Sequence, residues 1–106
     1  MSTITPDITR KIYTVVVASG SGSQALPTGM ANEIVQILVI PPVQTTTYHV
    51  YIRDGLDGVE VFRREDDLLG TYNEILTPCL PVFGNNTFHI SNASADGNFK
   101  LRVVYK

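Results

Sequence analysis

The chain has 106 residues, a formal net charge of −2 and a single cysteine. This length fits one domain, and an apolar content of 43% is enough for a hydrophobic core and too high for a disordered chain. The basic residues are scattered, so we expect no nucleic-acid binding, which needs a concentrated positive field. The longest apolar run, residues 37–42, is too short to span a bilayer, so we expect no membrane partner. With no signal-peptide pattern in residues 1–7 and no internal disulfide to form, synthesis in a reducing cytosol is the simplest interpretation.

Residues 1–9 are polar and interrupted by Pro6, and they predict an N-terminal arm ahead of a single β-sandwich domain over residues 10–106. Two interpretations of the arm stay open. One is a loose terminus, and the other is a segment that docks on a neighbouring subunit. In the second interpretation Ile4 and Ile8 are the candidate contacts.

The first predicted strand, residues 10–18, is rich in β-branched side chains, which suit a pleated, half-buried surface. Residues 19–32 follow as a long run of serine, glycine, proline and small side chains, with a short strand conceivable near residues 24–26. Long loops of this kind often carry function. The run is therefore a candidate partner-contacting loop with Leu26 and Met30 as apolar contacts, although a plain connector is the simpler interpretation.

Residues 33–40, EIVQILVI, favour a strand over a short helix, because the run is β-branched and two prolines close it. Both faces are apolar apart from Gln36. A strand with two apolar faces is expected in the middle of a sandwich or beneath another chain.

Residues 45–53 show the clearest alternation and predict a strand with Tyr48, Val50 and Ile52 facing inward. An Asp-Gly turn follows, which predicts a hairpin with a return strand over residues 59–64.

Residues 65–73 are polar and contain a glycine, so a turn or irregular connection is expected there. Residues 75–82 contain Pro78 and Pro81. Because proline cannot donate to a sheet ladder, any strand in this segment should lie at an edge or be broken.

Residues 87–91 and 98–105 alternate again and predict a closing hairpin. Together the segments give about seven or eight short strands separated by turn signals. The predicted fold class is all-β, an antiparallel β-sandwich of jelly-roll type.

Catalytic and metal-binding patterns are not found. Zinc needs three or four converging ligands, and Cys79, His49 and His89 lack the usual close spacings, so we expect no zinc site and an inert, buried thiol. The acidic residues around the predicted hairpin do not match an EF-hand loop, although a calcium site of another kind stays open; they are Asp54, Asp57, Glu60, Asp66 and Asp67. We therefore expect no enzyme activity and no cofactor.

Three apolar side chains, Tyr51, Phe62 and Val104, fall among polar neighbours on the predicted outward phase of their strands. Grouped apolar side chains on a surface mark an interface. Self-association is therefore expected, with these residues as candidate subunit or capsid contacts.

Residues 87–105, TFHISNASADGNFKLRVVY, resemble the ends of small β-sandwich virion proteins of tailed bacteriophages, typically capsid decoration (cement) proteins. The resemblance implies a jelly-roll-like homotrimer on the capsid surface that clamps neighbouring subunits of the major capsid protein after synthesis in the host cytoplasm. It carries no individual site residue over to this chain.

A capsid decoration subunit is therefore the leading hypothesis for function. The alternative is a carbohydrate- or receptor-binding β-sandwich module of a phage tail or fibre. Such a module needs exposed aromatic rings as a stacking platform, and only Tyr51 and Tyr72 are plausible candidates in a chain without tryptophan.

Overall fold

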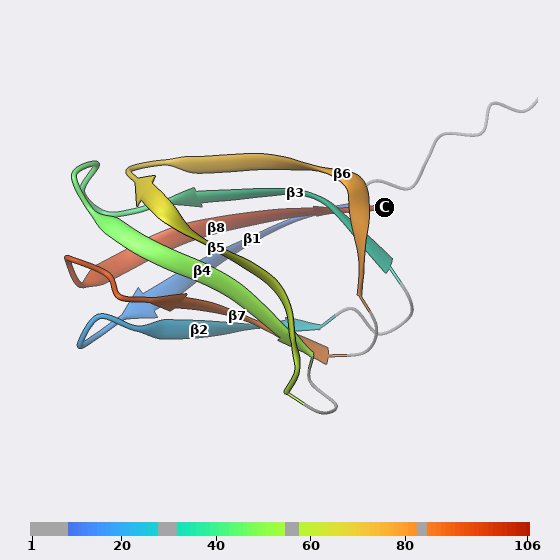
Figure 1. Cartoon of the computed structure of the whole chain (residues 1–106), viewed down its shortest axis with the longest axis horizontal. Helices are drawn as coiled ribbons and strands as arrows, with labels where there is room; N and C mark the ends of the chain where they lie inside the picture. The colour runs from blue at the N-terminus through green and yellow to red at the C-terminus, as the bar shows by residue number, and fades with distance from the viewer. Residues whose placement is uncertain (1–8, 28–31, 55–57, 83–84) are drawn as a thin grey trace, which may run out of the picture.

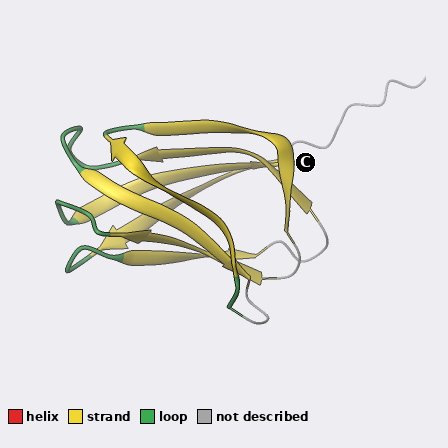
Figure 2. Ribbon diagram, in the orientation of Figure 1, coloured by secondary structure: helices red, strands yellow, loops and turns green. Residues whose placement is uncertain are grey.

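A computed structural model of the chain describes residues 9–27, 32–54, 58–82 and 85–106. These residues contain no helix and form the following strands (Figure 1): β1 (Thr9–Val17), β2 (Gly22–Pro27), β3 (Asn32–Ile40), β4 (Thr47–Asp54), β5 (Glu60–Leu69), β6 (Tyr72–Val82), β7 (Asn85–Ser91) and β8 (Gly97–Tyr105). They make two four-stranded antiparallel sheets packed face to face, as Figure 2 shows by its two layers of strands. The predicted all-β sandwich is confirmed.

The strand orders are β1-β8-β3-β6 in one sheet and β2-β7-β4-β5 in the other. The antiparallel pairs β1·β8, β2·β7, β3·β6 and β4·β5 are successive parts of one long hairpin that is rolled into two sheets. Eight strands connected in this way form a jelly roll. Only the β4–β5 connection stays within a sheet, and it is the hairpin that the sequence predicts.

The predicted closing hairpin is wrong. β7 pairs with β2 and β4, whereas β8 pairs with β1 and β3 in the opposite sheet. The connection between them crosses the end of the sandwich, where the Asp96 carboxylate accepts hydrogen bonds from the backbone N–H groups of Ser19 and Gly20 at 3.1 and 2.9 Å. These bonds fix the β7–β8 connection at the β1–β2 corner, where the chain passes from one sheet to the other.

The core fills the space between the two sheets with the inward-facing side chains of both. Tyr48, Val50 and Ile52 of β4 are at most 1% exposed, as their alternation predicts. The Tyr48 and Phe99 rings meet edge to face across the sandwich, with centroids 5.4 Å apart. The Tyr48 hydroxyl donates a hydrogen bond to the carbonyl oxygen of Gly70, and burial raises its pKa to about 12.

Positions within the sheets follow from strand composition. β3, apolar on both faces, lies between β8 and β6, and β6, with its prolines, lies at a sheet edge. Both positions confirm the predictions. The long loop predicted over residues 19–32 holds a full strand, β2, and the irregular stretch predicted over residues 65–73 is largely strand, since β5 runs to Leu69 and β6 begins at Tyr72.

Candidate functional site

One candidate surface is the outward side of the sheet β1-β8-β3-β6, which we call the basic–apolar face. Its apolar members include Ile12 and Val16 on β1 and Ile75 on β6, which are 70%, 64% and 67% exposed. The strand register places Ile12 and Leu38 on opposite sides of Arg102, and it places Ile75 beside Gln36. The three exposed side chains therefore lie on one side of one sheet, at its two edges.

Charge on this face is strongly biased. The outward positions carry the four cations Arg10, Lys100, Arg102 and Lys106. Among the described residues, Glu33 is the single carboxylate on this face. One of its carboxylate oxygens lies 3.6 Å from Lys106 Nζ. Four cations and one carboxylate give a local charge of +3, although the whole chain carries −2. The rest of the chain therefore carries −5, so the positive charge of this face has the opposite sign to the net charge of the chain.

Arg102 lies in the middle of this face, between β1 and β3 in the register. Its Nε atom is buried and has no hydrogen-bond partner among the described residues. A buried guanidinium donor without a partner costs free energy.

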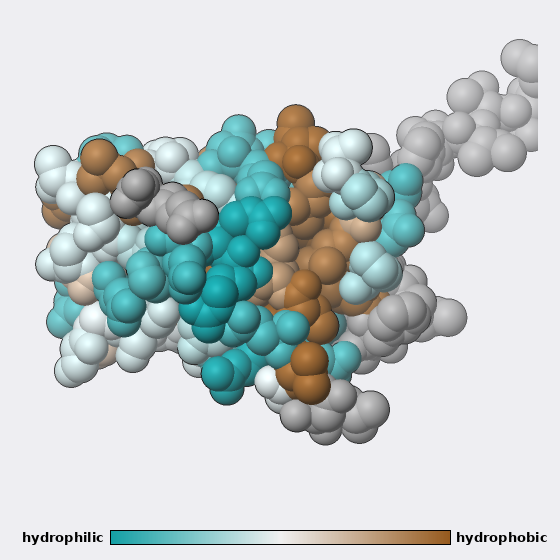
Figure 3. Space-filling view, in the orientation of Figure 1, coloured by the Kyte–Doolittle hydropathy of each residue, from teal (hydrophilic) through white to brown (hydrophobic). Residues whose placement is uncertain are grey.

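A second candidate surface is an opening between the edge strands β5 and β6. Its cavity measures about 630 Å³. Phe62 and Leu76 supply apolar walls, and Arg64 and Glu74 stand at its charged side. Figure 3 shows apolar atoms gathered beside a band of hydrophilic atoms on this side of the molecule.

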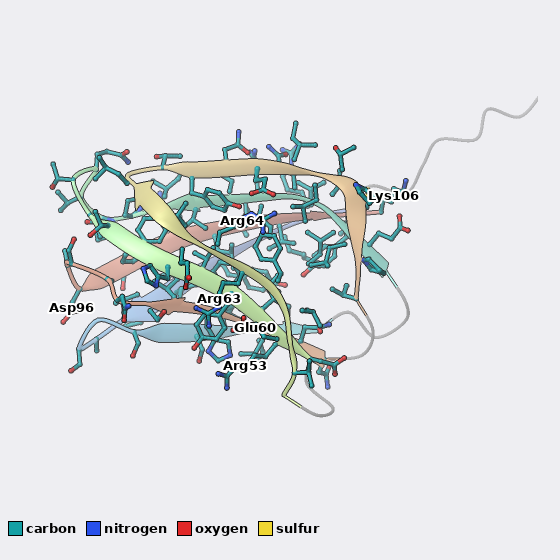
Figure 4. All side chains as sticks on the ribbon, in the orientation of Figure 1. Arg53, Glu60, Arg63, Arg64, Asp96 and Lys106 are labelled. Atoms are coloured by element: carbon teal, nitrogen blue, oxygen red, sulfur yellow. The ribbon has the colours of Figure 1, made fainter. Side chains whose placement is uncertain are left out.

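Arg64 connects the two sheets across this opening. Its guanidinium, 4.5 Å above the Phe62 ring, donates two hydrogen bonds at 2.8–2.9 Å to the Glu74 carboxylate on β6. Figure 4 shows Arg64 between β5 and β6, apart from Arg63 and Glu60. The Tyr72 hydroxyl donates a further hydrogen bond to Glu74. The hydrogen bonds from Arg64 are the main cause of the lowered pKa of Glu74.

We expect acid to weaken this connection. Because the pKa of Glu74 lies below its ordinary value of 4.5 in the folded chain, the carboxylate stabilises the fold at neutral pH, and the stabilisation is lost as pH falls through the folded-state pKa. The effect should stay below about 1 kcal/mol, since both side chains keep contact with solvent. Glu74→Gln should therefore lose less stability than the native chain between pH 7 and pH 3 in urea unfolding, with Glu65→Gln as the matched control. An identical pH dependence in the native chain and Glu74→Gln would contradict this role.

A third cluster lies on the outward side of the other sheet. The register places Tyr51 between His89 of β7 and Arg63 of β5. The Tyr51 ring stacks on His89 with centroids 4.7 Å apart, and the guanidinium of Arg63 lies 4.9 Å from the ring centroid. Arg53 adds a contact at 5.2 Å. Since ring neighbours stand on both sides of Tyr51, little of either ring face is free to stack on a sugar.

The predicted contact residues have different outcomes. Ile4, Ile8 and Met30 lie outside the described residues. Leu26 is fully buried in the core, and Phe62 is 8% exposed on the inward phase of β5, at the wall of the β5–β6 opening. Leu26 is buried because the supposed loop is a strand, and Phe62 faces inward, not outward as predicted, because β5 has an irregular register next to it.

Tyr51 and Val104 do face outward, as predicted. Tyr51 is half-buried within its cluster, and Val104 is 9% exposed because neighbouring side chains cover it. Sequence reasoning missed Ile12, Val16 and Ile75, which are more exposed than the selected residues Leu26, Tyr51, Phe62 and Val104. Their outward phase on apolar strands could have identified them.

The chemistry available at these surfaces is limited. Within residues 9–27, 32–54, 58–82 and 85–106, no three His, Cys, Asp or Glu side chains come together in a group that could hold a metal ion. Cys79 is half-buried at the β5–β6 opening, whereas we predicted a buried thiol. Among the described residues no helix is long and apolar enough to cross a membrane.

The topology defines a jelly-roll domain, and its surface carries the three candidate sites described above. No protein-family model matches the chain, and no curated protein is similar to it in sequence. Among solved structures it is similar to the cryo-EM structure of the extra small virus (XSV) VLP of the giant freshwater prawn Macrobrachium rosenbergii, at 14% identity and a TM-score of 0.35, covering 99% of this chain and 82% of that chain. It is also similar to the structure of infectious bursal disease virus Gx strain, at 16% identity and a TM-score of 0.32, covering 99% of this chain and 37% of that chain.

Proposed function

We propose that this chain is a structural protein of a virion, a capsid decoration (cement) subunit that binds the assembled lattice of the major capsid protein. Jelly-roll sandwiches are found in viral capsid and lectin domains. Because one fold hosts many functions, the proposal depends on a surface rather than on the topology. That surface is the basic–apolar face, with its exposed isoleucines and its local charge of +3.

The composition of this face indicates a protein partner. Exposed apolar side chains gathered on one surface mark interfaces, and Ile12 and Ile75 would gain nothing from contact with phosphates. Arg102, Lys100 and Arg10 fit carboxylates, which can form bidentate hydrogen bonds with a guanidinium. The expected partner surface is therefore acidic with apolar patches. Ile4, Ile8 and Met30 remain predicted contacts of the same assembly, and the resemblance to cement proteins implies a homotrimer.

The alternative, a carbohydrate- or receptor-binding module, has less support. Its stacking platform would be Tyr51 and Tyr72. The neighbours of Tyr51 stand on both sides of its ring, and Tyr72 is half-buried with its hydroxyl bonded to Glu74. A specific hit on a glycan array would favour the alternative over the capsid role.

The test of the proposal is sedimentation with assembled shells of the major capsid protein from the same genome. Reversing two charges with Lys100→Glu and Arg102→Glu should weaken binding by about ten-fold or more, because like charges facing each other across an interface cost several kcal/mol. Arg53→Glu with Arg63→Glu makes the same charge change on the opposite sheet and is the matched control. Circular dichroism checks that both variants are folded.

Two results would contradict the proposal in different ways. If the native chain does not sediment with shells, the decoration role is wrong. If the native chain binds and both double variants bind equally well, the role stands but the basic–apolar face is not the contact surface.

A further inference from the structure

The edge strands of the two sheets are protected to different extents against pairing with another chain. An unprotected edge strand is a template for strand addition, and bulges, charges and prolines are the usual protection. β5 has two register shifts against β4 and carries a run of charges, Arg63 to Asp67. β6 has a register shift against β3 and contains Pro78 and Pro81. Both of these edges are therefore poor templates.

The remaining edges are β2 and β1. β2 is six residues long and ends at Pro27. β1 is nine residues long, and its register with β8 is unbroken from Thr9 opposite Tyr105 to Val17 opposite Gly97. It contains no proline, no glycine and no carboxylate. β1 is therefore a long, regular edge strand without bulge or proline, and its charged side chains, Arg10 and Lys11, lie near its start.

The free part of this edge is limited at one end. The backbone of Gly22, at the start of β2, lies so close to β1 that a Cβ atom built there would come within 2.3 Å of the Val16 carbonyl oxygen. Strand β2 therefore blocks the edge at Val16 and Val17, whereas over residues 9–15 no other described strand pairs with the free edge, and we call this part the open stretch. Its middle residue is Ile12, which is 70% exposed, the highest exposure among the large apolar side chains described.

We propose that two copies of the chain pair antiparallel through their β1 edges, with a two-fold axis at Ile12. A symmetric pairing that uses the whole open stretch must be centred on its middle residue. Ile12 then packs against the partner's Ile12, and Arg10 lies opposite the partner's Thr14. Lys11 lies opposite the partner's Tyr13, where its aliphatic stem can cover the ring.

The placement of charge in β1 fits this orientation. Its two cations, Arg10 and Lys11, lie near one end of the strand, so antiparallel pairing sets the two cationic ends far apart. Parallel pairing would place Arg10 and Lys11 against the same cations of the partner, and like charges directly opposite each other destabilise a sheet. The strand therefore favours an antiparallel copy of itself.

The dimer would join two four-stranded sheets into one continuous sheet and two basic–apolar faces into one larger face. This inference concerns self-association alone and does not depend on the virion role. It differs from the homotrimer that the resemblance to cement proteins implies, so it can be tested on the purified chain in the absence of any shell.

The first experiment is disulfide crosslinking of Ile12→Cys in a Cys79→Ala background. Directly opposite residues of antiparallel strands have Cα atoms roughly 4.5–5.5 Å apart, within the range that a disulfide bridges. Mild oxidation should convert most of the protein to a covalent dimer. Ile75→Cys is the matched control, since Ile75 is 67% exposed at the opposite edge of the same face and should give little dimer.

The second experiment measures the dimer without a covalent bond, by analytical ultracentrifugation of the full chain. Ile12→Lys places two cations at the axis and should raise the dimer dissociation constant by about ten-fold or more. Ile75→Lys, with the same chemistry at the other edge, should leave the constant unchanged. A monomeric native chain overturns the proposal, and so does a dimer or trimer in which Ile12→Cys fails to crosslink or Ile75→Lys is the more disruptive change.

Discussion

Phe99→Ala is expected to lower the free energy of unfolding by about 4 kcal/mol, as removal of a fully buried phenylalanine usually costs 3–5 kcal/mol. Phe99 is 0% exposed, and its ring meets Tyr48 edge to face across the sandwich. The change leaves a cavity between the two sheets and removes the aromatic pair. Urea unfolding followed by circular dichroism at neutral pH measures the loss.

The matched control for this change is Ile75→Ala. Ile75 lies on the outward side of the same sheet and is 67% exposed, so its truncation should change the free energy of unfolding by less than about 0.5 kcal/mol. A loss of less than about 2 kcal/mol for Phe99→Ala would mean that the two sheets do not pack as closely as the described core requires.

Gly22→Ala is expected to be nearly as damaging, with a loss of about 3 kcal/mol. The added Cβ atom would lie 2.3 Å from the Val16 carbonyl oxygen and 3.2 Å from the Val17 Cα atom. Both contacts are with backbone, which cannot rotate away as a flexible side chain can. The corner between β1 and β2 would have to open, and the two sheets meet at this corner. Thermal unfolding measures the effect.

Gly58→Ala separates this steric effect from the general cost of replacing a glycine. Gly58 has a positive φ of 72° but nothing within 4 Å of its added Cβ atom. Its replacement should cost only about 1 kcal/mol, from backbone strain. Equal losses at Gly22 and Gly58 would show that the close approach of β2 to β1 is wrong. The open stretch of the β1 edge, and with it the two-fold axis at Ile12, would then have to be reassigned.

The sequence by itself determined most of the strands and much of their position. Alternation in β4 identified Tyr48, Val50 and Ile52 as core, because successive side chains of a strand point to opposite faces whatever the strand pairs with. Proline placed β6 at an edge, since it lacks the backbone N–H that a central strand needs. Apolar residues on both faces placed β3 inside its sheet. Each of these inferences depends on local chemistry.

The tertiary structure decided which strands pair and which surfaces remain open. β7 and β8 are neighbours in sequence but belong to opposite sheets, and the short run that contains Leu26 became a strand only because β7 pairs with it. The ion pair between Arg64 and Glu74 joins the two sheets. The residues that give the basic–apolar face its charge of +3 come from strands at both ends of the chain. An inward-facing apolar side chain fits either layer of a sandwich equally well, so alternation cannot choose between them. That choice depends on packing contacts between residues distant in sequence, which only the folded chain brings together.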